Sequence, residues 1–257
     1  MEVGGATATL TLDRPDRRNA QGPAFWRDLA TAGSSLPAHV RVVVVRAEGP
    51  SFSAGLDRRM FTPEGIPGEI NLARLAALAP DELDATIAGY QSAFSWLRDP
   101  AVVSVAAVQG HAIGAGFQLA LACDLRVLAD DAQLAMRETV LGLVPDLGGT
   151  APLVECIGYA RALELCVSGR SMDATEAVAC GLALRAVPAQ ELDLATQALV
   201  STLLAAPHGA VTQTKALLLG ATWRAPAEQL AAERAAQARR IANLMGAAPT
   251  SAEGVPD

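Results

Sequence analysis

Two short turns rich in glycine and alanine have the composition needed to bind a negatively charged oxygen. The turns are SAGL (residues 53–56) and IGAG (113–116), and each follows a strand-like apolar run and precedes a segment of helical composition. The first N–H groups of a helix have no acceptor within the helix and carry partial positive charge, and small residues let a ligand oxygen approach them. Two such amides aimed at one point would stabilise an enolate or a tetrahedral adduct by about 3 kcal/mol for each donor. Either turn taken alone is also typical of tight packing.

Three polar side chains after the second turn are candidates for proton transfer. Gln118 lies one turn inside the apolar segment IGAGFQLALACD, Glu138 lies in MRETVLG, and Asp146 lies in LVPDLGG. A carboxylate in a partly apolar cleft has a raised pKa, which suits proton exchange, whereas a neutral amide only donates and accepts hydrogen bonds. Each residue has a structural alternative: Gln118 would satisfy a buried polar neighbour, Glu138 would lie on an exposed loop, and Asp146 would cap the turn DLGGT.

These residues must be positioned by strands and helices, which alternate in the first half of the chain. Period-two alternation and unbroken β-branched runs predict strands, and apolar residues at helical spacing predict helices. The predicted strands are 7–12, 40–46, 102–108 and 125–128, and the predicted helices in this half are 25–32 and 82–98. Proline, glycine and irregular spacing predict a surface excursion over 61–80, and residues 150–245 are predicted to be nearly all helical. The pattern favours an α/β or α+β fold with a helical C-terminal region.

Composition and charge restrict the classes of protein to consider. The 257 residues are 51% hydrophobic, enough for a sizeable core, and the formal net charge of −7 argues against a general nucleic-acid binder. No window reaches the ~18–20 apolar residues of a membrane span, and the N-terminus does not resemble a signal peptide, so we expect a soluble cytoplasmic protein. The four cysteines form no CxxC pair and are predicted to be reduced core residues, and no spacing typical of metal ligands occurs.

Several motifs, in order along the chain, resemble those of the enoyl-CoA hydratase/isomerase, or crotonase, superfamily. SFSAGLD (51–57) resembles its F-[SC]-x-G-x-D box, and residues 106–150 resemble its central block through Gly-Gly-Thr. LDRPDRRNA (12–20) is similar to its N-terminal L-x-R-P-x-x-x-N-A segment, and residues 169–188 are similar to its A-x-G-L-[VA] region. The resemblance covers residues 3–245 and implies an α/β fold, a spiral core of ββα units with C-terminal helices that pack against neighbouring subunits.

The resemblance also implies an oxyanion hole and an unusual set of acid–base residues. The N–H groups of Leu56 and Ala115 would polarise the thioester carbonyl of an acyl-CoA, although the family often has glycine where Ala115 stands. Family hydratases carry two glutamates, at the positions of Gln118 and Glu138, so this chain keeps one carboxylate and replaces the other by an amide. An acid at Asp146 resembles the arrangement in dienoyl-CoA isomerases, which also need a carboxylate where Gln118 stands.

Binding of CoA is assigned by the same resemblance to the backbone of the first turn and to two cations. Instead of binding CoA, Asp57 could serve as a turn or cap residue, and Arg18 and Lys215 could each be a solvated surface charge. The implied CoA-binding residues are Ala54, Gly55, Leu56, Asp57, Arg18 and Lys215.

A site with one glutamate suits double-bond migration, in which a single base removes a proton from C2 and returns it at C4. We therefore expect an enzyme acting on fatty enoyl-CoA thioesters, with Glu138 as the general acid/base and Gln118 as an auxiliary polar group. Hydration by a water that Gln118 positions stays open. An acyl-CoA-binding protein that has lost catalysis is the alternative from a different class, and such a protein has no need for a carboxylate at Glu138.

The predicted organisation has three parts and one ligand. Residues 1–190 are predicted to form the core with the active site, 191–245 a helical region for oligomer packing, and 246–257 a disordered tail. No metal and no cofactor beyond the CoA moiety of the substrate are expected. The expected partners are the acyl-CoA substrate and further copies of the chain in a homotrimer or hexamer, with no nucleic acid and no membrane.

Overall fold

A six-stranded sheet forms the centre of the computed structural model, which describes residues 1–246. All neighbouring strands in it are parallel except the first pair. In spatial order the strands are β1 (Glu2–Gly4), β2 (Thr7–Leu12), β3 (Val42–Ala47), β4 (Val103–Val108), β6 (Leu125–Ala129) and β9 (Arg185–Val187). A second sheet contains β5 (His111–Ile113), β7 (Gln133–Ala135) and β8 (Met172–Asp173).

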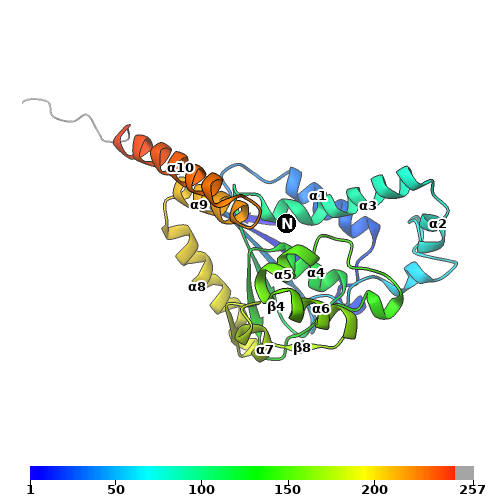
Figure 1. Cartoon of the computed structure of the whole chain (residues 1–257). Coiled ribbons are helices and arrows are strands. Elements are labelled where there is room, and N and C mark those ends of the chain that lie inside the picture. The colour runs from blue at the N-terminus through cyan, green and yellow to red at the C-terminus, as the bar shows by residue number, and fades with distance from the viewer. Residues whose placement is uncertain (247–257) are drawn as a thin grey trace, which may run out of the picture. The chain divides into compact units, whose positions relative to one another are not determined.

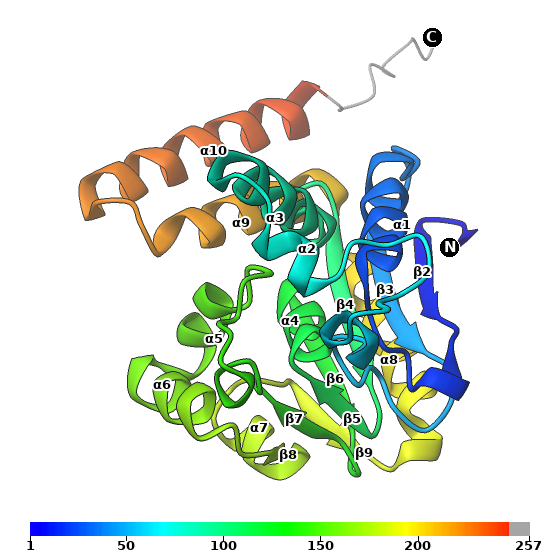
Figure 2. The ribbon, with the colours of Figure 1, turned by 90° about the vertical axis from the view of Figure 1, so that its right-hand side faces the viewer.

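Ten α-helices accompany the two sheets within the described residues (Figures 1 and 2). They are α1 (Pro23–Ser34), α2 (Leu72–Ala76), α3 (Pro80–Ser95), α4 (Ala115–Ala122), α5 (Thr150–Ile157), α6 (Tyr159–Ser168), α7 (Ala174–Ala179), α8 (Leu192–Ala205), α9 (His208–Ala221) and α10 (Pro226–Gly246). The short 3-10 helices are η1 (Pro15–Arg17), η2 (Arg58–Phe61), η3 (Trp96–Arg98), η4 (Thr139–Leu141) and η5 (Ala189–Glu191).

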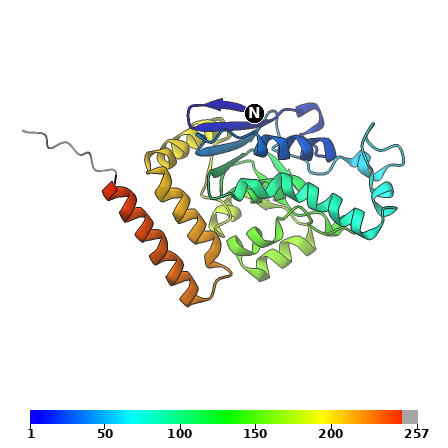
Figure 3. The ribbon, with the colours of Figure 1, turned by 90° about the horizontal axis from the view of Figure 1, so that it is seen from above.

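Both faces of the main sheet are covered, which explains the unbroken valine runs of its central strands. Side chains alternate along a strand, so Val43 and Val45 of β3 pack with α1, α3 and α4 on one face. Val42 and Val44 pack on the other face with residues such as Leu199 of α8. Figure 1 shows the sheet between α8 and α4, and Figure 3 shows α1 beside α3.

Helix α4 is the buried element at the centre of the first face. All eight of its residues are buried, and its apolar composition on every side is typical of such a helix. Arg126, only 6% exposed, lies at its C-terminal end and donates to the carbonyls of Ala120 (3.2 Å), Cys123 (2.7 Å) and Leu182 (2.5 Å). The bonds to Ala120 and Cys123 satisfy carbonyl groups that the end of α4 leaves without partners.

Two regions differ from the sequence prediction. The expected irregular excursion over 61–80 contains α2, which begins where the Asn71 side chain accepts a hydrogen bond from the Arg74 N–H at 2.9 Å. The region after residue 150, expected to be nearly all helical, includes the strands β8 and β9, and β9 pairs with β6 at the edge of the main sheet. These elements have two to five residues each, which is too short for a periodic pattern to show.

The chain divides into two compact units, Met1–Ala205 and the residues from Ala206 onward. Helix α8 belongs to the first unit, while α9 and α10 form the second and pack on each other, with Gln229 Nε2 donating to the Leu217 carbonyl at 3.3 Å. Oligomer packing by 191–245 stays a prediction. The predicted tail, 246–257, lies outside the described residues except for Gly246, the last residue of α10.

No single helix within residues 1–246 is long and apolar enough to cross a membrane; only the pair Ala189–Ala205 and His208–Ala221, taken together, passes that test on length and composition.

Candidate active site

The two glycine and alanine turns lie side by side. Ser53 and Ala112 form a parallel β-bridge, in which the Ser53 N–H donates to the His111 carbonyl and the Ile113 N–H donates to the Ser53 carbonyl, both at 2.9 Å. This placement agrees with the prediction that both turns contribute to one site, although the turns begin 60 residues apart in the sequence (53 and 113).

Glycine is required where the two turns touch. Gly55 has a φ of +82°, and a Cβ placed on it would lie 2.3 Å from the Ile113 carbonyl oxygen and 3.5 Å from the Ala115 nitrogen. A Cβ on Gly116 would lie 2.6 Å from the Ser53 carbonyl oxygen. Any side chain at either position would force the turns apart.

The two predicted oxyanion-hole donors are available. Ala115 is the first residue of α4, and Leu56 follows Gly55 in the adjoining turn. Within residues 1–246 neither N–H has a protein acceptor, and both residues line the same cavity. An oxygen placed between them would accept two hydrogen bonds, and their role in an oxyanion hole stays a prediction.

Glu138 is a buried carboxylate in this cavity. The residue is 9% exposed, and its Oε1 accepts a hydrogen bond of 2.7 Å from Gln118 Nε2. Its Oε2 is buried and has no partner among the described residues. Burial raises the pKa of the Glu138 carboxyl, and the nearby Asp146 carboxylate raises it further. The alternative of an exposed loop glutamate is excluded by this burial.

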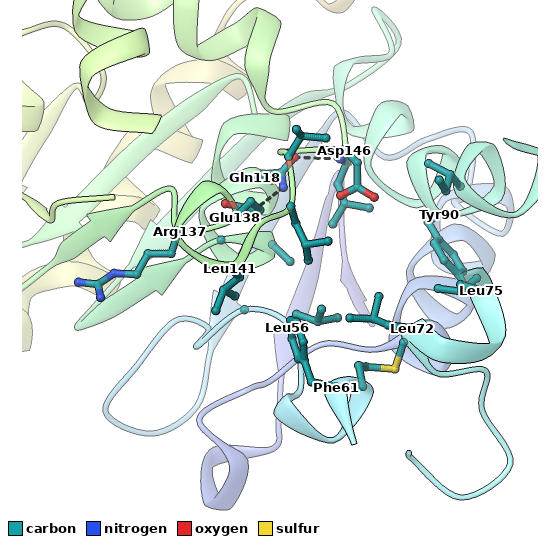
Figure 4. Close-up of a pocket in the computed structure, with 18 of the residues that line it drawn as sticks. Leu56, Phe61, Leu72, Leu75, Tyr90, Gln118, Arg137, Glu138, Leu141 and Asp146 are labelled. Atoms are coloured by element: carbon teal, nitrogen blue, oxygen red, sulfur yellow. Dashed lines mark hydrogen bonds between the residues drawn. The ribbon is translucent and has the colours of Figure 1, made fainter. Parts of the chain in front are cut away.

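Gln118 connects Glu138 to the turn at residues 146–149. While Nε2 donates to Glu138, Oε1 accepts from the N–H of Leu147 at 2.9 Å and from the N–H of Gly149 at 3.3 Å. Figure 4 shows the amide between Glu138 and the turn. The amide orientation follows from this hydrogen-bond network. Gln118 thus satisfies buried polar neighbours, and one of those neighbours is the candidate catalytic carboxylate.

Asp146 lies at the same cavity as Glu138 (Figure 4). Its side chain is half-buried, and burial raises the pKa of its carboxyl. Its main-chain carbonyl accepts from Gln91 Nε2 at 2.7 Å. The alternative role for Asp146 is to cap the turn DLGGT by accepting hydrogen bonds from its N–H groups. Within residues 1–246 the N–H groups of Leu147 and Gly149 donate to Gln118 instead, so Asp146 does not have this role.

Asp57 has the contacts of a cap. Its carboxylate is the N-cap of η2, accepting from the Arg59 N–H at 3.0 Å, and it forms an ion pair of 2.7 Å with the Arg59 guanidinium. The hydrogen bonds from Arg59 hold the pKa of Asp57 below its usual range. The side chain does not line the cavity, so its contacts match the alternative of a cap rather than a CoA contact.

Replacing Asp57 with Ala is expected to lower stability by about 0.5–2 kcal/mol through loss of the cap. Because the folded-state pKa is lowered, this contribution is present above the unfolded pKa and is lost as pH falls through the folded pKa. Thermal unfolding of wild type and variant should therefore differ at neutral pH and converge in acid. A large loss of CoA affinity in the variant would instead support the predicted binding role.

The other predicted CoA-binding residues have different placements. Ala54, Gly55 and Leu56 line the cavity. Arg18 is exposed, and its carbonyl accepts from the Ala54 N–H at 2.8 Å, which places it beside the first turn. Lys215 belongs to α9 in the second unit, and its predicted contact with a CoA phosphate stays a prediction.

Two arginines and two aromatic residues are among the cavity residues that are absent from the sequence-based candidates. Arg58 and Arg137 directly adjoin Asp57 and Glu138 in the chain, so their adjacency could have indicated them. Trp26 and Tyr90 have no such local signal, because they meet only when α1 packs on α3, with ring centroids 4.6 Å apart. The cavity has a volume of about 750 Å³. No group of His, Cys, Asp and Glu within the described part of the chain could hold a metal ion.

Comparisons with known proteins agree with the resemblance in the motifs. The chain matches the family model for enoyl-CoA hydratase/isomerase over residues 2–245. The Bacillus subtilis (strain 168) protein YhaR is 35% identical, over 91% of this chain and 87% of its own length. Human mitochondrial Delta(3,5)-Delta(2,4)-dienoyl-CoA isomerase is 33% identical, over 86% of this chain and 68% of its own length. A Thermobifida fusca YX protein solved in complex with CoA is 51% identical with a TM-score of 0.90, covering 96% of this chain and 93% of that chain.

These findings confirm the predicted α/β crotonase-like fold with a helical C-terminal region. The family model matches nearly the whole chain, and relatives are more than 30% identical to it. Both findings confirm the prediction of an enzyme of the enoyl-CoA hydratase/isomerase type. The chain belongs to the enoyl-CoA hydratase/isomerase family.

Proposed function

We propose that the protein catalyses migration of a double bond in an enoyl-CoA thioester from the 3,4 to the 2,3 position. The observation that carries the proposal is the Glu138 carboxylate, which is buried with one oxygen bonded to an amide and the other without a partner in the described residues. A raised pKa suits a group that must accept a proton and hold it until it is returned.

The proposed reaction uses three groups. The thioester carbonyl oxygen accepts hydrogen bonds from the N–H groups of Leu56 and Ala115. Glu138 Oε2 removes a proton from C2 of the 3-enoyl group, and the electrons of that C–H bond move into a dienolate whose negative oxygen stays between the two N–H groups. The same carboxyl then donates the proton to C4, leaving the double bond between C2 and C3.

Hydration is less well supported than isomerisation. A hydratase needs two groups that hold and deprotonate a water, and the Gln118 oxygen already accepts from the N–H groups of Leu147 and Gly149. One Nε2 hydrogen donates to Glu138, so the amide has only its second N–H left for a water. Glu138 alone would then have to activate the water.

Asp146 is proposed as a second proton-exchanging group for substrates whose double bonds extend further along the acyl chain. Support comes from its position at the same cavity as Glu138, from its raised pKa and from the name of the human relative, a dienoyl-CoA isomerase. The resemblance to dienoyl-CoA isomerases implies carboxylates at the positions of Gln118, Glu138 and Asp146. This chain differs from that pattern because residue 118 is a neutral amide.

Acyl-CoA is the proposed ligand, and no cofactor beyond its CoA moiety is proposed. Thermobifida fusca YX proteins about half identical to this chain have been solved with CoA and with acetoacetyl-CoA, which supports the proposal. The alternative of a binder without catalysis gives no reason for a buried carboxylate beside two N–H groups that have no acceptor among residues 1–246. Assembly of the chain into a homotrimer or hexamer is likewise proposed.

A parallel assay of the purified protein on trans-3-enoyl-CoA and trans-2-enoyl-CoA of matched lengths tests this function. We expect 2-enoyl-CoA to form from the 3-enoyl substrate faster than 3-hydroxyacyl-CoA forms from the 2-enoyl substrate. Faster hydration would contradict the proposed isomerase function and support a hydratase. Binding of both compounds without turnover of either would support the non-catalytic binder.

A further inference from the structure

The cavity extends well beyond the two N–H groups of Leu56 and Ala115. Its volume is about 750 Å³, whereas the five heavy atoms of a butenoyl group occupy about 150 Å³ if each takes roughly the 30 Å³ of a water molecule. Cavities of this size bury most of the surface of a drug-sized ligand. A four-carbon acyl group would therefore fill only about a fifth of the cavity.

Two helices turn apolar stripes toward this space. Leu72, Leu75 and Ala76 line the cavity from α2 at spacing i, i+3 and i+4, which places them on one face of the helix. The matching stripe on α3 has spacing i, i+4 and i+7, and it consists of Leu83, Ile87 and Tyr90. Within α3 only Ala93 and Phe94 are buried. The stripe itself is half-buried, and Tyr90 packs on Trp26 at the edge of the core while it lines the cavity.

The opposite wall is also apolar. Val140, Leu141, Leu143 and Val144 line the cavity just after Glu138, and Val140 and Val144 are 61% and 68% exposed. Figure 4 shows Leu72, Leu75 and Tyr90 across the cavity from Glu138 and Leu141. Apolar side chains that face one another across water-filled space are stabilised when an apolar ligand displaces the water.

Charge is confined to other parts of the cavity lining. The charged lining residues are Glu138 and Asp146 beside Gln118, and the exposed Arg58 and Arg137. The lining side chains that α2 and α3 contribute carry no charge. An acyl group that extends along these helices would therefore have to be uncharged.

We propose that the site selects long, uncharged, apolar acyl groups of about eight or more carbon atoms, and that the stripes on α2 and α3 bind them. This inference rests on the proposed function, because it takes the Leu56 and Ala115 N–H groups as the site of the thioester carbonyl. It assigns a specificity role to a segment, residues 61–95, that has no catalytic group.

Calorimetric titration with saturated acyl-CoAs, which bind but have no double bond to move, tests the proposal. Each buried methylene contributes about fourfold in affinity (~0.8 kcal/mol), so decanoyl-CoA should bind at least about a hundredfold more tightly than butanoyl-CoA. Decanoyl-CoA with a terminal carboxylate, an analogue of equal chain length, should lose most of this gain. Equal dissociation constants for butanoyl- and decanoyl-CoA would overturn the proposal.

Two variants of α3 locate the binding surface. Ile87→Gln places a polar side chain in the stripe and should weaken decanoyl-CoA binding about tenfold while leaving butanoyl-CoA binding unchanged. Ala85→Gln makes a similar change at an exposed position outside the cavity lining and should alter neither. An unchanged decanoyl-CoA affinity in Ile87→Gln would show that the chain lies elsewhere.

Turnover of 3-butenoyl-CoA on the same preparations separates this inference from the proposed function. Isomerisation of this short substrate together with equal affinities at all chain lengths would reject the length selection and keep the function. A steep length dependence without isomerisation would reject the function and keep an apolar acyl site. Flat affinities and no isomerisation would reject both.

Discussion

Glu138→Gln is expected to reduce isomerisation of a 3-enoyl-CoA by on the order of 10³-fold, the scale on which general acid–base groups contribute. The amide oxygen can still accept the hydrogen bond from Gln118, so the cavity keeps its shape. Affinity for a saturated acyl-CoA should stay within about twofold, because glutamine has nearly the same volume and hydrogen-bonding reach as glutamate. The measurement is kcat on the enoyl substrate together with calorimetric Kd for the saturated analogue.

The stability of Glu138→Gln should not fall with its turnover. Burial raises the folded-state pKa of Glu138, so the folded protein binds this proton more tightly than the unfolded chain does. The stability that this group contributes is full below its unfolded pKa and is lost as pH rises through the folded pKa. At neutral pH the unfolding temperature of Glu138→Gln should therefore be equal to or higher than that of the wild type. The difference between the two unfolding temperatures should disappear in acid.

The matched control is Glu2→Gln, which changes an exposed glutamate on β1. It should leave kcat, Kd and the unfolding temperature unchanged. Wild-type turnover in Glu138→Gln would remove the assigned role. A loss of turnover in a variant that also unfolds early would point to structural damage instead.

Gln118→Leu is expected to have the largest effect on stability among the site variants. It removes three hydrogen bonds and leaves the N–H groups of Leu147 and Gly149 without an acceptor in a buried place. Each buried group left unsatisfied costs about 1–3 kcal/mol, so we expect a loss of about 2–5 kcal/mol and a fall in Tm of roughly 5–15 °C. Turnover should also fall, because Glu138 loses the bond that orients it. Calorimetric unfolding and kcat on a 3-enoyl-CoA measure the two effects.

Gln118→Glu is the informative companion to this variant. A glutamate would still accept from both backbone N–H groups, so most of the stability should return. Its other oxygen would lie about where Nε2 now stands, 2.7 Å from Glu138 Oε1, and two carboxylates at that distance share one proton. Repulsion between the two carboxylates raises the pKa at which the pair loses its second proton, and only that loss leaves Glu138 fully ionised, so the acid limb of kcat/KM for isomerisation should move to higher pH.

The pH profile and the stability together decide the role of Gln118. A merely structural residue would lower Tm in the leucine variant without moving the pH profile of the glutamate variant. An unshifted acid limb in Gln118→Glu would mean that the amide does not act on the carboxyl of Glu138. A rise in hydration of trans-2-enoyl-CoA in this variant would show that the amide is what limits that reaction in the wild type.

Local backbone requirements made part of the site predictable from the sequence. The glycines of SAGL and IGAG mark turns that tolerate no side chain, and Gly55 and Gly116 do meet the opposite turn where a Cβ would collide. Glu138 stands in a mostly apolar stretch, which favoured a functional carboxylate over an exposed loop residue, and Glu138 is buried. The valine runs of β3 and β4 predicted strands covered on both faces, as observed.

The partners of Gln118 could not be predicted in this way. The N–H groups that bind its oxygen come from residues 29 and 31 positions further along the chain. Periodicity identifies elements but does not say which loop returns to which side chain. The same limit applies to Trp26 and Tyr90, which meet through helix packing, and to β8 and β9, whose pairing depends on strands formed elsewhere.

Arg126 has a consequence for the reaction although it does not line the cavity. Its guanidinium fixes the carbonyl end of α4, and the Ala115 N–H stands at the opposite end, about 12 Å away along eight residues. A cation at the negative end of a helix dipole, joined to it by hydrogen bonds, stabilises the helix, and a stable helix holds its first N–H in one direction. When charge develops on a substrate oxygen, a donor already held in that direction needs little reorganisation. Arg126 would then lower the free energy of forming an enolate that it never contacts.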